Sequence, residues 1–361
     1  AALEGGTGAL VTSSGMAAIF LAIHTLMKTG DHLVSSPALY GGTDTAFRYT
    51  LPRIGIGVTF ADPANPDAVR QAITPATRAV YIETIGNPNG AVPDIAAIAA
   101  IAHEAKIPLI VDNTFAPVFC RPFDHGADIV VHSCTKWIGG HGTSIGGVII
   151  DSGRFNWASG KFPEFTTPDE SYHGLVYHEA FGNLPGMGNV AFILKARLQG
   201  MRNIGPCPSP FNSFMFLQGI ETLPLRIRAQ SENAAQLAQW LKGHRCVDWV
   251  CYTGLADHPS HAVARRLFRG GFGAVLGFGI KGGRVAGEKF INSVKLASHL
   301  ANVGDAKTLV LHPGSTSHQQ MTDEAQRAAG VTPEFIRVAV GLEHIEDIIA
   351  DFDAALAASQ R

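Results

Sequence analysis

The sequence predicts an α/β protein in which a large, mostly parallel sheet domain is followed by a smaller α+β domain. Between residues 10 and 150, segments with helical apolar spacing alternate with short, nearly continuous apolar runs. Such runs are typical of parallel strands whose two faces are covered by helices, and the alternation indicates a doubly wound domain. A Pro-rich break at 206–210 precedes a long helical stretch. We therefore expect the large domain over 1–207 and the small domain over 208–361.

The individual elements follow from local periodicity. In the first domain, helical spacing covers 14–27 and 95–105, and apolar runs predict strands over 31–35, 79–83, 109–112, 129–132 and 146–150. In the second, we expect a helix over 211–242, strands near 273–280 and 335–340, and a final amphipathic helix over 345–357. The segment 155–188 is rich in aromatics, Pro and Gly. It is either a long excursion over a site or a pair of helices with weak periodicity.

Composition excludes several classes of protein. Charged residues make up 16% of the 361 residues and the formal net charge is −2, so the chain lacks the basic surface that nucleic acid requires. No apolar stretch is long enough for a membrane span. The five cysteines form no C-x-x-C pair, which favours free thiols in a reducing cytosol over a disulfide framework or a zinc site. We expect a cytoplasmic protein with small-molecule partners, no bound metal, and no membrane or nucleic-acid contact.

Polar residues fall at the carboxyl ends of predicted strands, where ligands of open α/β sheets bind. Asp112 closes one strand, Asn87 lies just beyond another, and Lys136 follows a third. Lysine is rarely buried without a reason. A desolvated lysine has a lowered pKa and becomes a nucleophilic amine, as Schiff-base chemistry needs.

The neighbours of Lys136 strengthen this interpretation. Ser133 and Thr135 supply hydroxyls that can bind phosphate oxygens beside the amine. The segment Ser14-Gly15-Met16 opens a predicted helix, whose first turn favours an anion. Asp112 can pair with a protonated pyridine nitrogen. A lysine, an acid and a phosphate cradle together predict a pyridoxal-phosphate (PLP) site.

These segments resemble the Cys/Met-metabolism PLP-dependent enzymes of fold type I over essentially the whole chain. The resemblance rests on residues 13–18 (SSGMAA), 40–43 (YGGT), 83–88 (ETIGNP), 111–115 (VDNTF) and, above all, 128–147, which contains SCTKWIGGH. The segments 302–309 (NVGDAKTL), 312–316 (HPGST) and the insertion 162–174 are similar to the O-acetylhomoserine sulfhydrylase branch.

The resemblance implies roles for individual residues. Lys136 would be the Schiff-base lysine and proton shuttle, Asp112 the partner of the ring nitrogen, and Tyr40 the aromatic residue that stacks on the ring and helps the leaving group. Arg337 would clamp the substrate α-carboxylate. Other residues would also bind the cofactor or the substrate: Ser14, Gly15, Met16, Ser133 and Thr135 at the phosphate, Asn87 at the ring hydroxyl, and Asn302 at the substrate.

The implied reaction is γ-replacement, in which O-acetyl-L-homoserine and sulfide (or methanethiol) give homocysteine (or methionine) and acetate. The alternatives are γ-elimination, cystathionine synthesis, and an inactive PLP-binding scaffold. The resemblance also implies a homotetramer of dimers with shared active sites. Family members carry a preceding arm with a Tyr-x-Arg pair that reaches a neighbouring subunit's phosphate. We expect this arm to be missing, because the chain begins at AALEGG.

Three other interpretations have weaker support. Glycines at 271–277 resemble a dinucleotide loop, but they lie in a strand-like run with no helix expected close behind. The histidines at 132, 141, 173 and 178 match no zinc spacing. No Gly-x-Ser-x-Gly elbow indicates a serine hydrolase.

Overall fold

The computed structural model describes residues 1–86, 90–316, 319, 322, 324, 326 and 330–361. The chain forms two compact units, each built from separate stretches of sequence. Unit 1 comprises Ala1–Thr84, Pro93–Thr135 and Ser144–Phe216, and unit 2 comprises Ile85–Val92, Lys136–Thr143 and Leu217–Arg361. The domain boundary expected at residue 207 stays a prediction.

Unit 1 is organised around a seven-stranded sheet with the order β1-β7-β6-β5-β4-β2-β3. Its strands are β1 (Gly8–Thr12), β2 (His32–Ser35), β3 (Gly57–Phe60), β4 (Thr77–Glu83), β5 (Leu109–Asp112), β6 (Ile129–Ser133) and β7 (Gly147–Asp151). The pairs β3–β2, β2–β4, β4–β5 and β5–β6 are parallel. The α/β class and the mostly parallel sheet are therefore confirmed.

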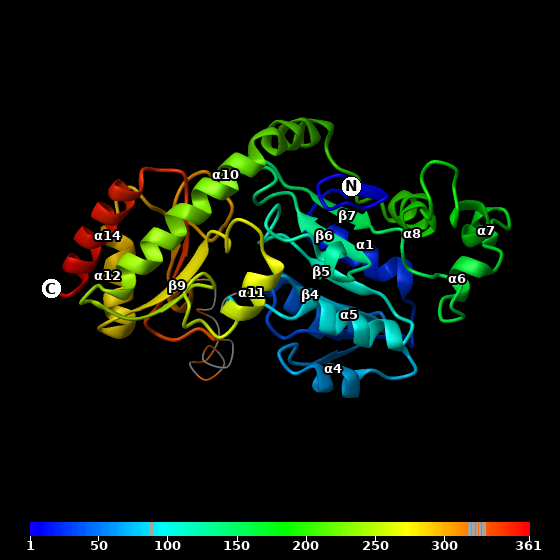
Figure 1. The fold of residues 1–361 in the computed structure, drawn as a ribbon, viewed down its shortest axis with the longest axis horizontal. Helices are drawn as coiled ribbons and strands as arrows, with labels where there is room; N and C mark the ends of the chain where they lie inside the picture. The colour runs from blue at the N-terminus through cyan, green and yellow to red at the C-terminus, as the bar shows by residue number, and fades with distance from the viewer. Residues whose placement is uncertain (87–89, 317–318, 320–321, 323, 325, 327–329) are drawn as a thin grey trace. The chain divides into compact units, whose positions relative to one another are not determined.

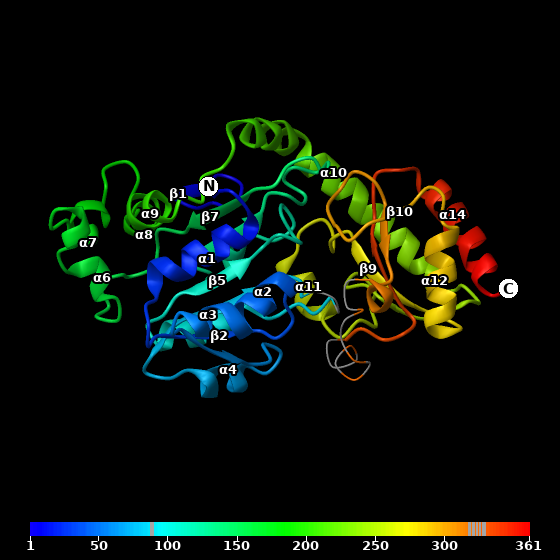
Figure 2. The same cartoon turned by 180° about the vertical axis from the view of Figure 1, so that it is seen from behind.

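Helices cover both faces of this sheet. Figure 1 shows α5 (Ile95–Glu104) on one face, and Figure 2 shows α1 (Gly15–Leu26) on the other. Asp94 caps α5 and Ser14 caps α1, each accepting a hydrogen bond from a first-turn backbone N–H. The helical segments α2 (Gly41–Thr45), η1 (Ala46–Thr50), α3 (Leu51–Arg53) and α4 (Pro66–Ala72) complete the first half of the unit.

The edge of the sheet differs from the expected parallel arrangement. Strand β7 is antiparallel to both β6 and β1. The chain between Ser133 and Gly147 contains no helix, and a parallel return requires a crossover, usually helical. A short apolar run does not reveal strand direction, so the sequence could not distinguish these two cases.

The segment 155–188 contains three short helical elements, α6 (Pro163–Thr166), η3 (Glu170–Tyr172) and α7 (Tyr177–Phe181). Its aromatic side chains pack into unit 1. Trp157 stacks between Phe165 and Phe192, with ring centroids 4.6 and 5.4 Å away, and Phe162 meets Trp157 edge to face. Burial of these rings anchors the insertion. The helices α8 (Ala191–Lys195), η4 (Ala196–Met201) and α9 (Arg202–Ile204) follow it.

Unit 2 contains a five-stranded sheet with the order β10-β11-β12-β9-β8. The strands are β8 (Val247–Cys251), β9 (Val275–Ile280), β10 (Ser298–His299), β11 (Leu309–Leu311) and β12 (Phe335–Ala339). The helices are α10 (Pro210–Lys242), which begins in unit 1, α11 (His261–Leu267), α12 (Gly283–Ser293) and α14 (Ile345–Ser359). One apolar core joins α10, α12 and α14 to the central strands.

Helix α12 was not expected from the sequence, and it begins only three residues after β9 ends. The absence of a nearby helix was therefore a wrong reason for rejecting a dinucleotide loop there. The glycines themselves have a packing explanation. A Cβ at Gly277 would lie 2.4 Å from the Phe335 ring, and one at Gly279 would lie 2.2 Å from the Trp249 ring.

All five cysteines are free thiols. Within the described part of the chain, no helix is both long and apolar enough to cross a lipid bilayer.

Candidate active site

Asp112, the last residue of β5, lies among hydrogen-bond donors of unit 1. Its Oδ1 accepts a hydrogen bond from the Thr114 backbone N–H at 2.9 Å, and its Oδ2 accepts one from the Tyr81 hydroxyl at 3.2 Å. Burial raises the pKa of the Asp112 carboxyl, whereas the hydrogen bonds from Thr114, the positive charge of His132 and the Tyr81 hydroxyl lower it. The residue as a whole is only partly buried.

Glu83 ends the neighbouring strand β4 and lies opposite Asp112 in the strand register. Burial and the charge of Asp112 raise its pKa well above the usual range, and the hydrogen bond from the Tyr40 backbone N–H only partly offsets this. Two adjacent carboxyl groups do not both ionise readily. Because Asp112 accepts more hydrogen bonds, we infer that Asp112 carries the charge and Glu83 the proton. Glu83 opens the sequence motif 83–88 (ETIGNP), but the motif alone does not indicate a role for its carboxyl group.

Tyr40 is therefore attached to the acidic pair through its backbone. Its N–H donates to Glu83 Oε1 at 2.6 Å, and it immediately precedes α2. Its side chain is half exposed, at 51% of the maximum, and is thus open to a ligand.

The start of α1 and the end of β6 approach each other closely. A Cβ at Gly15 would lie 2.7 Å from Ser133 Cβ, and a Cβ at Gly147 would lie 2.1 Å from the Ser14 carbonyl oxygen. Glycine is thus required at both positions. The structure brings Ser14, Gly15 and Ser133 together, as the predicted phosphate cradle needs, with first-turn N–H groups of a 12-residue helix beside them.

Thr135 and Met16 have other contacts in unit 1. The Thr135 hydroxyl bonds to the backbone of Gly146, at 3.2 Å from its N and 3.3 Å from its carbonyl oxygen. This pair closes the loop that carries Lys136. The sulfur of Met16 accepts a hydrogen bond from the Thr43 hydroxyl at 3.8 Å.

Lys136 follows Thr135 directly in the chain and belongs to unit 2. Its Nζ donates a hydrogen bond to Asn302 Oδ1. Burial, and secondarily the positive charge of Arg337, lowers its pKa to about 8. Arg337 in turn donates from Nη2 to the Asn302 carbonyl oxygen at 3.4 Å. The structure thus groups the predicted lysine with both predicted substrate-binding residues, Asn302 and Arg337. Asn87 lies outside the described residues.

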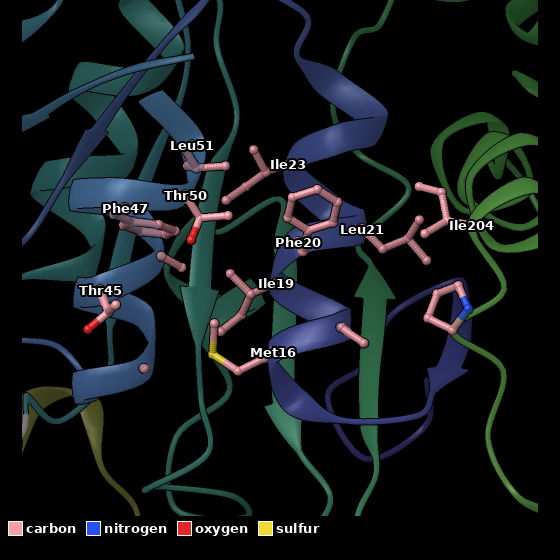
Figure 3. Close-up of a pocket in the computed structure, with 14 residues that line it drawn as sticks. Met16, Ile19, Phe20, Leu21, Ile23, Thr45, Phe47, Thr50, Leu51 and Ile204 are labelled. Atoms are coloured by element: carbon pink, nitrogen blue, oxygen red, sulfur yellow. The ribbon is translucent and has the colours of Figure 1, made fainter. Parts of the chain in front are cut away.

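A groove of about 440 Å³, which Met16 also lines, lies on unit 1 between α1 and the segment from Gly42 to Leu51 (Figure 3). Ile19, Phe20 and Ile23 of α1 line it, facing Phe47 and Leu51. Its lining is almost entirely apolar, so it lacks the convergent polar groups of a catalytic pocket. Within the described residues, no cluster of three or more potential ligands could hold a metal ion.

Comparison with known proteins finds relatives that are similar over nearly the whole chain. An O-acetyl-L-homoserine sulfhydrylase of Leptospira meyeri is 52% identical over 360 residues, covering 99% of this chain and 81% of the relative. A homocysteine synthase of Schizosaccharomyces pombe is 53% identical, covering 99% and 82%.

A crystal structure of a putative O-acetylhomoserine (thiol)-lyase from Campylobacter jejuni, which contains a pyridoxyl-lysine phosphate, superimposes with a TM-score of 0.92. It is 35% identical and covers 99% of this chain and 84% of its own. The sequence pattern of the Cys/Met metabolism PLP-dependent enzymes matches residues 1–357. Together with the relatives that are about half identical over nearly the whole chain, this match shows that the chain belongs to the Cys/Met metabolism family of PLP-dependent enzymes.

Proposed function

We propose that this enzyme makes homocysteine from O-acetyl-L-homoserine and sulfide, releasing acetate, and that methanethiol can replace sulfide to give methionine. The observation that carries the proposal is the agreement of relatives at 52% and 53% identity, named O-acetyl-L-homoserine sulfhydrylase and homocysteine synthase. Each covers 99% of this chain.

The chemistry of the residues present fits PLP. Lys136 offers an amine whose pKa is lowered to about 8 by burial and by Arg337, as a Schiff base requires. Asp112 offers a carboxylate at a strand end, already held by hydrogen bonds from Thr114 and Tyr81. The close approach of Gly15 to Ser133 leaves no room for a side chain beside the first turn of α1, where anions bind. When bound, PLP supplies an electron sink for the substrate α-carbon.

Each residue has a task in the proposed reaction. Asp112 would hold the proton on the ring nitrogen, and the Lys136 amine would take the α-proton and later return one. The guanidinium of Arg337, with Asn302 beside it, binds the substrate α-carboxylate as a planar fork. Acetate leaves the γ-carbon and sulfide adds there.

The remaining predicted residues bind the cofactor in the same proposal. Tyr40 would stack on the ring, and Asn87 would donate to its hydroxyl. The phosphate is held by the cradle of Ser14, Gly15, Met16, Ser133 and Thr135. The Thr135 hydroxyl already bonds to Gly146, so its contribution would come with a change of partner or through its backbone.

A steady-state assay with purified protein distinguishes this function from its rivals. Given O-acetylhomoserine and saturating sulfide, the enzyme should form homocysteine much faster than 2-oxobutyrate. Dominant 2-oxobutyrate would identify γ-elimination instead. Turnover only with cysteine as the thiol would indicate cystathionine synthesis. No turnover of any activated homoserine ester by PLP-loaded protein would leave a binding scaffold.

We also propose a cellular compartment and an oligomeric state for the enzyme. The free thiols support a cytoplasmic enzyme, and the family resemblance supports a homotetramer built from dimers with shared sites. Sedimentation at working concentration should show the tetramer, and a monomer that nevertheless turns over substrate would contradict shared sites.

A further inference from the structure

A buried arginine on α10, Arg226, has no role in the reaction proposed above. It is 6% exposed, although arginine is rarely buried unless a partner holds its charge. Among the described residues, no carboxylate forms an ion pair with its guanidinium. A buried charge of this kind is costly unless other polar groups hold it, which makes its contacts informative.

The guanidinium of Arg226 joins two separate stretches of backbone. Its Nη2 donates to the Trp137 carbonyl oxygen at 3.0 Å and to the Gly219 carbonyl oxygen at 2.6 Å. Its Nε donates to the Thr222 hydroxyl at 3.1 Å. Trp137 follows Lys136 directly in the chain, and all these residues belong to unit 2. The side chain therefore ties the segment that carries Lys136 to α10.

A local role in α10 does not account for all of these bonds. The helix contains Pro224 in its interior, and proline there removes a helical hydrogen bond. The bonds from Arg226 to Gly219 and Thr222 connect the helix before and after the proline. The bond to Trp137 leaves the helix and does not brace it. This bond calls for a different explanation.

The backbone that follows Lys136 forms a tight turn against Arg226. The Gly140 N–H donates to the Lys136 carbonyl oxygen at 2.7 Å, and Gly140 has a φ of +75°, which favours glycine. A Cβ at Gly140 would lie 2.2 Å from Arg226 Nη1. The guanidinium thus lies directly against this turn and supplies the donor for the Trp137 carbonyl within it.

Two other glycines bring the backbone of unit 2 against the same turn. A Cβ at Gly219 would lie 2.3 Å from the Ile138 carbonyl oxygen, and one at Gly304 would lie 2.6 Å from the Trp137 nitrogen. Backbone atoms cannot rotate away from such a contact as a flexible side chain can. The turn is therefore closely held, and the backbone of Lys136 with it.

We propose that Arg226 is a positioning residue for Lys136: by holding the Trp137 carbonyl against α10, it fixes the backbone from which the Lys136 amine reaches its reactants. The inference rests on the proposed role of Lys136 as the Schiff-base lysine and proton carrier. A displacement of about 1 Å can cost about a hundredfold in rate. Substrate binding should change little, because the proposed function assigns the substrate carboxylate to Arg337 and Asn302.

The test compares Arg226→Met with Asn233→Ala. Asn233 is the matched control, because its Nδ2 also joins α10 to two backbone carbonyls, those of Gly341 and Glu343, at 3.1 and 2.9 Å. In PLP-loaded enzyme, Arg226→Met should lower kcat about tenfold or more and keep KM within about threefold. PLP-free Arg226→Met should also form the borohydride-reducible bond to PLP about tenfold more slowly.

The control separates positioning from stability. Both variants should lower the midpoint of thermal unfolding, because each leaves two backbone carbonyls without a donor. Asn233→Ala should nevertheless keep kcat and the rate of bond formation within about twofold. An equal loss of kcat in Arg226→Met and Asn233→Ala would overturn the inference, since the effect would be one of stability.

Gly219→Ala tests the same inference with the arginine in place. Alanine is a better helix former than glycine, so a weaker helix cannot explain a loss of rate. The new Cβ would meet the Ile138 carbonyl oxygen at 2.3 Å and should displace the turn, lowering kcat about tenfold or more with KM nearly unchanged. Normal kcat in this variant would show that the position of the turn does not matter, and the inference would fail.

Hydrogen exchange read by mass spectrometry gives a direct measure of the turn. The amide hydrogens of residues 136–140 should exchange about tenfold faster in Arg226→Met and at the native rate in Asn233→Ala. Unchanged exchange in Arg226→Met would overturn the inference.

The role of Lys136 is tested separately. If Lys136→Ala keeps a borohydride-reducible bond to PLP, that role fails and this inference fails with it. If Lys136→Ala loses the bond but Arg226→Met has native kcat and exchange, this inference alone fails.

Discussion

The lowered pKa of Lys136 leads to a quantitative prediction for cofactor attachment. With a pKa of about 8, about one in ten Lys136 amines is unprotonated at pH 7, which is about 300 times more than for a lysine with an ordinary pKa. Because the free amine attacks the aldehyde, the rate at which PLP binds covalently should rise with pH and level off above about 8.

The perturbation that tests the cause is Arg337→Gln. Burial is the larger cause of the lowered pKa and the charge of Arg337 the smaller. The rate of PLP attachment rises with pH, and its midpoint reports the pKa of Lys136. Removing the charge of Arg337 should raise this midpoint by less than half of the total lowering of the Lys136 pKa, or by less than about 1.2 pH units. The exposed Arg245, also in unit 2, provides a matched control, and Arg245→Gln should leave the midpoint unchanged.

The assay is stopped-flow mixing of PLP-free protein with PLP across a pH series, following the visible absorbance. Titrating a free lysine derivative against PLP corrects for the ionisation of PLP itself. If the attachment rate of the unaltered protein has its pH midpoint near that of the free lysine derivative, burial does not lower the pKa of Lys136. A rise above about 1.2 pH units in Arg337→Gln would show that charge, rather than burial, dominates.

Three further predictions concern the other residues. Asp112→Asn should lower kcat by several powers of ten while circular dichroism shows an intact fold, because a charge that stabilises the carbanion acts mainly in the transition state; near-normal kcat in PLP-loaded protein would contradict its assignment. Gly15→Ala should weaken PLP binding about tenfold or more, since its Cβ would meet Ser133 at 2.7 Å, whereas Gly41→Ala, which meets nothing within 4 Å, should bind PLP normally in the same equilibrium titration. Lys136→Ala should lose the borohydride-reducible bond to PLP, and its retention would mean that another lysine is the anchor.

The elements that the sequence predicted best are those in which one strong signal sets both ends. The apolar run that ends at Asp112 gave the bounds of β5 without error. The apolar spacing over 95–105 predicted α5 to within one residue, and the Asp94 cap that begins the helix was seen only in the structure. The antiparallel β7 and helix α12 were missed, because strand direction depends on the connection and α12 contains two glycines.

The same reasoning applies to the site. Asp112, Gly15 and Lys136 could be found because each stands beside a strand end or a helix start. Glu83 could not be given a role, because its meaning depends on the strand pairing that sets it opposite Asp112. Arg226 and Trp137 are 89 positions apart in sequence, and only the folded chain brings them together.

The way the chain threads through its two units restricts how the enzyme can be divided. Unit 2 takes eight-residue excursions, Ile85–Val92 and Lys136–Thr143, out of the middle of unit 1's sequence. A fragment expressed from residue 208 or 217 onward would therefore lack Lys136 and both excursions. Recombination therefore cannot exchange unit 2 between relatives as one contiguous stretch of sequence. Exchange among relatives should be tolerated where all three stretches of unit 2 come from the same parent. Chimaeras joined at residue 217 alone would combine stretches of unit 2 from two parents and should be less stable.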